Sequence, residues 1–223
     1  MSDQPIVQMR GITKRFGGVT ALQDVNFEAR AGEVTAIVGD NGAGKSTLIK
    51  VLTGVYQPSE GEILLDGKPL VMASHSDAIA VGIDAVYQTL ALADHLTPAA
   101  NMFLGNELTR KFAGFNVLDN KRMKSEAERV LFERLGVTLR SMDAQTDSLS
   151  GGQRQAIAIA RAVYHEDLRV LVMDEPTAAL GPQETARTLK LIKVLREQGL
   201  AVILISHSLD AVSYTHLTLP TKA

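Results

Sequence analysis

Cysteine is absent from this 223-residue chain, and so are a basic excess and any long apolar run. Without cysteine the chain has neither a disulfide framework nor a thiolate metal site. Asp and Glu number 25 against 23 Lys and Arg, a net charge of −2, which argues against a broad nucleic-acid-binding surface. The longest apolar stretches fall well short of the ~20 residues that span a bilayer. We therefore expect a soluble intracellular protein, and Met1–Arg10 does not read as a signal peptide.

Hydrophobic periodicity predicts an α/β chain into which a helical segment is inserted. The expected strands cover 6–16, 20–29, 33–38, 63–65, 169–173 and 201–205, and the expected helices cover 46–52 and 182–198. Asp66–Gly67 favours a type I′ hairpin turn. Between about 90 and 148, apolar residues recur at helical spacing, which predicts a mostly helical lobe. The return to strand, helix and strand after this lobe predicts a parallel sheet.

A candidate phosphate-binding loop follows the expected strand at 33–38. It matches the pattern G-x-x-x-x-G-K-[ST], and its residues are Gly39, Asp40, Asn41, Gly42, Ala43, Gly44, Lys45 and Ser46. The glycines let backbone N–H groups turn toward phosphate oxygens, Lys45 adds a point charge, and the Ser46 hydroxyl suits Mg²⁺. We expect Thr47 to begin a helix whose dipole favours the anion. The alternative is a chance glycine turn, but the flanking strand and helix favour a nucleotide site.

Two carboxylates, Asp174 and Glu175, end the apolar strand at 169–173. Ligands bind at the carboxyl ends of strands in open α/β sheets. Asp174 is therefore expected to hold Mg²⁺ directly or through water, and Glu175 to polarise the attacking water. An ordinary strand exit, where acidic residues are common, is the alternative.

A second glycine motif precedes a helix-forming run of small apolar residues. Its residues are Ser150, Gly151, Gly152 and Gln153. Ser150 can cap that helix, and the glycine pair allows close approach of a bound group. One nucleotide does not need two such sites from a single chain. A head-to-tail pair of chains would use both, whereas the simpler alternative is a glycine-capped core helix.

At this motif, Leu149-Ser150-Gly151-Gly152-Gln153, the chain resembles the ATP-binding-cassette (ABC) ATPase family. The resemblance implies an α/β phosphate-loop NTPase fold over 5–212, with an N-terminal antiparallel β subdomain and an inserted helical subdomain at about 90–162. It also implies that Phe16 stacks on adenine, that Gln88 contacts Mg²⁺ and water, and that His207 holds the catalytic water with Glu175. Each of these three residues taken alone also fits an ordinary structural position.

Several further stretches are similar to cassettes that power monosaccharide importers of the ribose, xylose, galactose or fructose type. They are 39–50, 54–58, 87–92, 96–97 and 101–105. The resemblance implies an ATPase with ATP and Mg²⁺ as cofactors, peripheral on the cytoplasmic face of the inner membrane. Its implied partners are a second cassette (in a homodimer or as a fused cassette), a membrane permease and, indirectly, a periplasmic sugar-binding protein, with no nucleic acid. The sugar is chosen by those partners.

Two rival functions share these motifs. One is a non-transport cassette, such as a translation or DNA-repair factor, and the other is a regulatory module that holds ATP without turnover. The chain also departs from the family pattern twice. Gly181 stands where the family usually has an Asp that helps couple the two ATP sites, and 213–223 does not resemble the family sequence. We expect that tail to be an artefact joined to a truncated chain.

Overall fold

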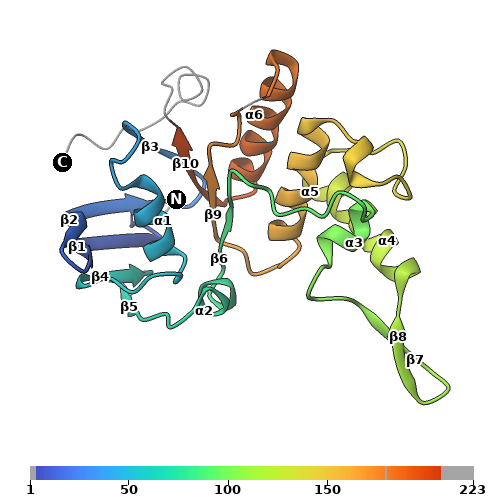
Figure 1. Ribbon diagram of the computed structural model, residues 1–223, viewed down its shortest axis with the longest axis horizontal. Helices are drawn as coiled ribbons and strands as arrows, with labels where there is room; N and C mark the ends of the chain where they lie inside the picture. Colours follow the sequence, from blue (N-terminus) through green and yellow to red (C-terminus); the bar gives the residue numbers. More distant parts are fainter. Residues whose placement is uncertain (1–3, 179, 207–223) are drawn as a thin grey trace. The chain divides into compact units, whose positions relative to one another are not determined.

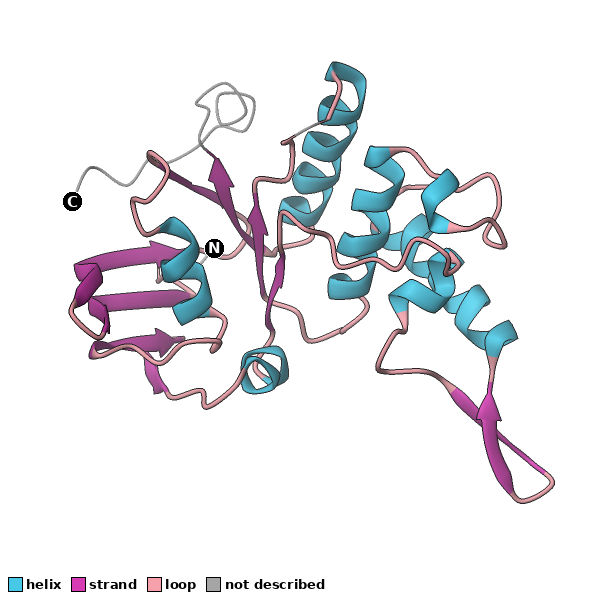
Figure 2. Cartoon of the chain, viewed as in Figure 1, coloured by secondary structure: helices cyan, strands magenta, loops and turns pink. Residues whose placement is uncertain are grey.

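The computed structural model describes residues 4–178 and 180–206 (Figure 1). The chain divides into two compact units. Unit 1 comprises Met1–Gln88, Asp167–Ala178 and Leu195–Ala223, and unit 2 comprises Thr89–Glu166 and Ala179–Val194. Strands dominate unit 1 and helices dominate unit 2 (Figure 2).

An antiparallel sheet in the order β2-β1-β4-β5 opens unit 1. Its strands are β1 (Val7–Phe16), β2 (Val19–Ala29), β4 (Glu60–Leu65) and β5 (Lys68–Leu70). Between β4 and β5, Asp66 has φ 51° and Gly67 has φ 73°. Two successive positive φ values are the signature of the type I′ turn, so the hairpin predicted from Asp66–Gly67 is confirmed.

A parallel sheet in the order β3-β10-β9-β6 forms the rest of unit 1's strand content. Its strands are β3 (Val34–Val38), β10 (Ala201–Ser206), β9 (Val170–Asp174) and β6 (Ile83–Val86). Ile205 pairs with Ile37 on one side and with Asp174 on the other. The carboxyl ends of these strands therefore meet at one edge, where the segments after β3, β6 and β9 emerge together.

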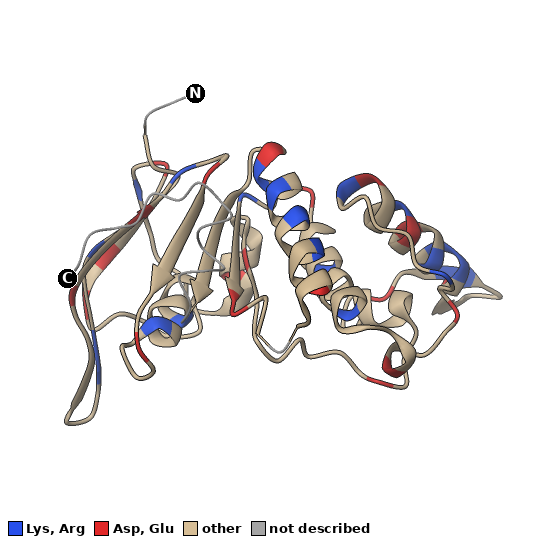
Figure 3. Ribbon diagram, turned by 90° about the horizontal axis from the view of Figure 1, so that it is seen from above, with Lys and Arg blue, Asp and Glu red and all other residues tan. Residues whose placement is uncertain are grey.

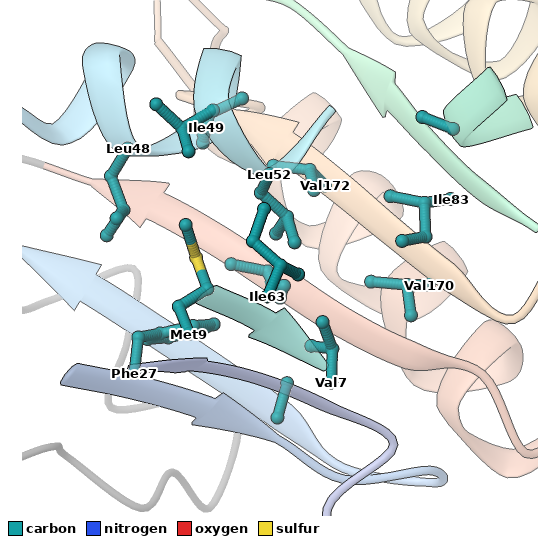
Figure 4. Close-up of a cluster of buried hydrophobic side chains, with 14 of the residues drawn as sticks. Val7, Met9, Phe27, Leu48, Ile49, Leu52, Ile63, Ile83, Val170 and Val172 are labelled. Carbon is teal, nitrogen blue, oxygen red and sulfur yellow. The ribbon is translucent and has the colours of Figure 1, made fainter. Parts of the chain in front are cut away.

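Helix α1 (Lys45–Leu52) is held in place by the core of unit 1 (Figure 4). Its Leu48, Ile49 and Leu52 are buried beside side chains from both sheets. The labelled neighbours are Val7, Met9, Phe27, Ile63, Ile83, Val170 and Val172. An eight-residue helix is marginal alone. Burial of each of the three side chains contributes about 1.5–3 kcal/mol. Packing against the two sheets therefore stabilises the helix and fixes its position.

Unit 2 is mostly helical, as its periodicity predicts. Its helices are α3 (Pro98–Met102), α4 (Asn120–Arg129), a π-helical turn (Val130–Arg134), α5 (Gly151–Val163) and most of α6 (Pro182–Glu197). A short helix, α2 (His75–Ala80), belongs to unit 1. In the described part of the chain, none of the helices has the length and apolarity needed to cross a membrane.

The prediction for the helical lobe missed a β-hairpin. Strands β7 (Thr109–Phe112) and β8 (Phe115–Leu118) pair through a turn at Ala113 and Gly114, which have φ 48° and 86°. Its apolar residues Phe112, Phe115 and Leu118 are exposed rather than packed on a core, so their spacing carries no information about burial. A prediction from hydrophobic periodicity therefore had no signal for these strands.

A buried amide ties together the start of unit 2. Asn101 is fully buried, and its side chain accepts a hydrogen bond from the Ala93 N–H and donates to the Ala93 carbonyl and the Thr146 hydroxyl. The Thr146 hydroxyl donates in turn to the Leu96 carbonyl at 2.7 Å. Because buried amides need partners, this network fixes the segment that follows Gln88.

Candidate functional site

The candidate site is a cleft of about 410 Å³ at the carboxyl edge of the parallel sheet. This volume lies in the range typical of small-molecule sites. Residues of the phosphate loop, the segment after β6 and the end of β9 line it. They are Asn41, Gly42, Gly44, Lys45, Ser46, Thr47, Gln88, Asp174 and Glu175, with Val19, Thr20, Ala21 and Ile205. The structure thus brings together most of the predicted phosphate and metal residues.

The N-terminus of α1 is open toward an anion. Its N-cap is Gly44, which has φ 87° and supplies no side-chain cap. Among the described residues of the first turn none is acidic, whereas α2 and α3 are capped by Ser74 and Thr97. The first N–H groups of α1 therefore lack the side-chain oxygen that usually occupies them, which leaves them for a phosphate. The helix begins at Lys45, one residue before the predicted helix 46–52 and two before the predicted dipole start at Thr47.

Lys45 folds back over the phosphate loop. Its ammonium Nζ donates hydrogen bonds to the carbonyl oxygens of Gly39 and Asp40, at 2.6 and 2.8 Å. These contacts hold the charge at the mouth of the loop. An arriving phosphate would meet both the ammonium group and the uncapped helix N-terminus, and charge-assisted hydrogen bonds of this kind are about twice as strong as neutral ones.

Gly44 gives a sharp test of the loop's shape. A Cβ there would lie 2.7 Å from the Ala21 carbonyl oxygen and 2.9 Å from Leu22 Cδ2 of β2. We expect Gly44→Ala to weaken nucleotide binding by at least about tenfold, because the left-handed backbone and the clash both distort the loop. Gly42 is the matched control, since its φ of 86° is close to that of Gly44 but a Cβ there would meet nothing within 4 Å. Calorimetric titration should show a much smaller loss for Gly42→Ala; equal losses would mean that the β2 contact is irrelevant.

Asp174 and Glu175 form an anionic corner of the cleft. Burial raises the pKa of Asp174, and the neighbouring Glu175 carboxylate raises it further, while the ammonium groups of Lys45 and Lys50 oppose the shift. Glu175 has φ 48°, which is strained for a residue with a side chain. Its N–H donates to the Ile205 carbonyl at 3.0 Å, which ties the end of β9 to β10. Such a corner is stabilised by a cation.

The oxygen donors of the cleft fit Mg²⁺. The Ser46 hydroxyl, the Gln88 amide and the Asp174 carboxylate line the same cleft. Oxygen ligands of this kind suit Mg²⁺, which commonly takes one or two carboxylates and completes its shell with phosphates and water. Within the described ranges, no group of three or more His, Cys, Asp or Glu could hold a metal. Because the three oxygen donors include a single carboxylate, they suit a cation whose shell the phosphates of a nucleotide complete.

Phe16 is not among the residues that line this cleft. Phe16 is 42% exposed at the end of β1, and its ring packs edge-on against Tyr56, with ring centroids 5.1 Å apart. The Lys14 ammonium lies 5.1 Å from the Phe16 ring centroid. A partly exposed ring that packs on Tyr56 is available to stack on a base. The stacking of Phe16 on adenine stays a prediction.

The second glycine motif lies at the N-terminus of α5, in unit 2. The Ser150 hydroxyl accepts from the Gln153 N–H, and the Gln153 side chain accepts from the Ser150 N–H, as in a capping box. The predicted cap is therefore confirmed. The structure adds Glu184, which accepts a hydrogen bond from the Gly152 N–H at 3.4 Å. Hydrogen bonds from Gly152 and Ser150 lower the pKa of Glu184. The N-terminus of α5, which favours anions, is therefore already in contact with a carboxylate.

Two predictions fall outside the described residues, namely the role of His207 and the nature of 213–223. Sequence reasoning also missed two contributors that the structure adds. Val19–Ala21 line the cleft from β2, and Glu184 reaches the second glycine motif from α6. The β2 residues carry no motif. For Glu184, a carboxylate in the first turn of a helix was the available signal, but it is too common to point to a partner.

The sequence profile of the family described as ABC transporter matches residues 22–178, more than half of the chain. The chain belongs to the ABC transporter family. The resemblance drawn from the glycine motif is thereby confirmed, and the chain is an ATP-binding cassette of that family. The phosphate loop, Gln88 and the Asp174–Glu175 corner all fall within the matched residues.

Sugar-import proteins are similar to this cassette over most of its length. The fructose import ATP-binding protein FrcA of Rhizobium meliloti is 45% identical, covering 95% of this chain and 82% of the relative. The xylose/arabinose import ATP-binding protein XylG of Sulfolobus acidocaldarius is 42% identical, covering 94% and 80%. The ribose import ATP-binding protein RbsA 1 of Rubrobacter xylanophilus is 45% identical, but the cassette spans only 41% of that relative.

Solved structures with the same fold are also ABC cassettes. The ADP conformation of MJ1267, an ATP-binding cassette of an ABC transporter, has a TM-score of 0.80 and 29% identity, covering 97% of this chain and 87% of the other. A dimeric post-hydrolysis state of the cassette MJ0796, bound to ADP and phosphate, has a TM-score of 0.75 and 26% identity, covering 96% and 93%. These matches confirm the predicted fold class.

Proposed function

We propose that this cassette is the ATP-hydrolysing subunit of a monosaccharide importer. The carrying observation is the cleft that joins the phosphate loop to Gln88 and to the Asp174–Glu175 corner. The similar import proteins support the transport role and disfavour the non-transport alternative. Glu175 lines the cleft beside Asp174, where a carboxylate can serve as a general base, and this favours turnover over a module that only binds ATP.

The mechanism follows from the residues that line the cleft. The phosphate loop and the N-terminus of α1 would bind the triphosphate, with the Lys45 ammonium turning from its loop carbonyls to the outer phosphates. Mg²⁺ would be held by Ser46, Gln88 and Asp174. When bound, it would neutralise the charge that develops on the transferred phosphoryl group. Glu175 would orient and deprotonate the attacking water, supported by His207. Phe16 would stack on the adenine.

The second glycine motif completes the site of another copy in this proposal. Ser150–Gln153 would contact the triphosphate gripped by a partner cassette, and Glu184 would have to release Gly152 as the phosphate arrives. The dimeric cassette bound to ADP and phosphate supports a paired arrangement. The further proposed partners are a membrane permease and, through it, a periplasmic sugar-binding protein, with the cassette peripheral on the cytoplasmic face of the inner membrane.

A boundary at 5–212 with a helical lobe at about 90–162 remains our proposal for the domain, with 213–223 as a foreign tail. Gly181 stands where the family usually has an Asp that helps couple the two ATP sites, and we propose that Gly181 alters this coupling. A Cβ at Gly181 meets nothing within 4 Å among the described residues, so Gly181→Asp fits sterically. Resequencing the source DNA through residue 213 decides whether the tail is genuine.

Sugar uptake tests the proposed function. Disrupting the gene in its source organism should abolish uptake of one radiolabelled monosaccharide among fructose, ribose, xylose and galactose. The wild-type gene should restore uptake, whereas a Glu175→Gln copy should not. Unchanged uptake of all four sugars, together with ATP hydrolysis by the purified chain, would leave a non-transport ATPase as the better account.

A further inference from the structure

The β7–β8 hairpin extends from the helices of unit 2 into solvent (Figure 1). Every residue of both strands is exposed except the half-buried Val117. A two-stranded hairpin is marginally stable in water unless it packs on something. The proposed ATPase site gives this hairpin no task, so its surface calls for a separate explanation.

The strand register gathers apolar side chains at the tip. Phe112 pairs with Phe115 next to the turn, and Arg110 pairs with Val117 one step further along the same face. Phe112 is 61% exposed and Phe115 is 74% exposed. The Arg110 guanidinium lies 5.8 Å from the Phe112 ring centroid. One face of the hairpin thus combines two exposed aromatic rings with a cation.

The charged side chains of the two hairpin strands are all cations, and the acidic residues Glu107 and Asp119 flank the hairpin. Arg110 and Lys111 lie in β7, and Lys121 and Arg122 lie in the first turn of α4, where the hairpin rejoins the helices. Figure 3 colours Lys and Arg blue and Asp and Glu red along the ribbon. These four cations are exposed, and none of them forms an ion pair within the described part of the chain. From 108 to 118 the sequence contains no acidic residue. Unpaired cations beside exposed aromatic rings are complementary to an anionic, partly apolar surface.

We propose that the β7–β8 hairpin contacts an anionic phospholipid surface, with Phe112 and Phe115 entering the headgroup region and Arg110 and Lys111 meeting lipid phosphates. This inference goes beyond the proposed ATPase function and does not depend on nucleotide.

The size of the hairpin favours lipid over a protein partner. Strands of four residues each present far less than the roughly 800 Å² per partner of a stable protein interface. A lipid surface, in contrast, binds through a few interfacial aromatic side chains and a few cations. Two exposed aromatic side chains and two cations are enough for a weak, reversible contact with lipid. Such a contact matters in an assembly that other subunits also hold at the membrane.

The absence of tryptophan from the chain gives a clean probe. In the Phe115→Trp variant of the full chain, the introduced side chain is the only tryptophan. Phosphatidylcholine vesicles containing phosphatidylglycerol should shift its emission to shorter wavelength, and brominated lipids should quench it. Pure phosphatidylcholine should act at least about tenfold more weakly, since each cation contributes about a fivefold change near an anionic surface.

Phe132→Trp is the matched control, because Phe132 is 67% exposed on the π-helical turn of the same unit. Its emission should not respond to vesicles. Phe112→Ser and the double change Arg110→Gln with Lys111→Gln, each combined with Phe115→Trp, should abolish the response at wild-type ATPase rates.

No emission change with anionic vesicles would overturn the proposal. A change seen only in proteoliposomes that carry membrane subunits would also overturn it, because the partner would then be a protein. If the Phe115→Trp protein responds to anionic vesicles but does not hydrolyse ATP, the result counts against the proposed function and not against the lipid contact.

Discussion

Glu175→Gln should lower steady-state ATP hydrolysis by about 10²–10⁴-fold, the usual effect of removing a positioned general base. The change keeps the size of the side chain and removes its charge and basicity. Burial and the Glu175 carboxylate both raise the pKa of Asp174, so the variant also relieves repulsion in that corner. We propose that ATP binding closes the dimer and that hydrolysis opens it. We therefore expect the variant to bind ATP as well as or more tightly than the wild type and to accumulate as ATP-bound dimers.

Release of inorganic phosphate measures the rate of hydrolysis, and size-exclusion chromatography with ATP measures the accumulation of dimers. Glu33→Gln is a control with the same chemical change, because Glu33 is exposed just before β3 and does not line the cleft. That control should hydrolyse ATP at the wild-type rate. A Glu175→Gln variant that hydrolyses ATP within a few-fold of wild type would remove Glu175 from the mechanism.

Lys45→Met should weaken ATP binding by about 100-fold or more, because hydrogen bonds to charged groups contribute about 1.5–3 kcal/mol each. The substitution also removes the contacts from Nζ to the carbonyl oxygens of Gly39 and Asp40, which loosens the loop before the nucleotide arrives. Hydrolysis should fall with binding. A fluorescent ATP analogue titrated into each variant gives the dissociation constants.

Lys50→Met provides the control from the same helix. Lys50 lies on α1 with its ammonium 5.5 Å from the Tyr56 ring centroid, and it does not line the cleft. Nucleotide affinity should change only a few-fold in this variant, since the remaining effect is the loss of a positive charge near Asp174. Equal losses at both lysines would mean that general positive charge, rather than the loop, holds the nucleotide.

The phosphate site was predictable because each of its parts has a local cause. The loop pattern at 39–46 needs glycine and lysine at fixed spacing, and β3 and β9 are short apolar runs that can only be buried. The structure confirmed these strands and the cap at Ser150. It also showed the cleft that the phosphate loop shares with Gln88 and the end of β9.

The remaining features depend on partners distant in the sequence. The β7–β8 hairpin was missed because exposed Phe112 and Phe115 give no burial pattern. Glu184 reaches Gly152 across 32 positions, and Ala21 limits the space at Gly44. Nothing local in the sequence marks such contacts. They follow from packing, which a pattern along one chain does not encode.

A mixing experiment tests most directly the claim that two copies build each ATP site. One variant, Lys45→Met, loses its phosphate loop, and the other, Gly152→Asp, loses the second glycine motif. A Cβ at Gly152 would meet Glu184 no closer than 3.5 Å, so this variant should fold while its new carboxylate repels phosphate. Each variant alone should be inactive, because every site in its dimers lacks one part.

Mixed dimers contain one complete site, so an equimolar mixture should recover roughly a quarter of the wild-type rate if pairing is random. That recovery, measured as ATP hydrolysis against mixing ratio, is the result our account predicts. A mixture as inactive as its two components, with mixed dimers shown to form, would contradict it.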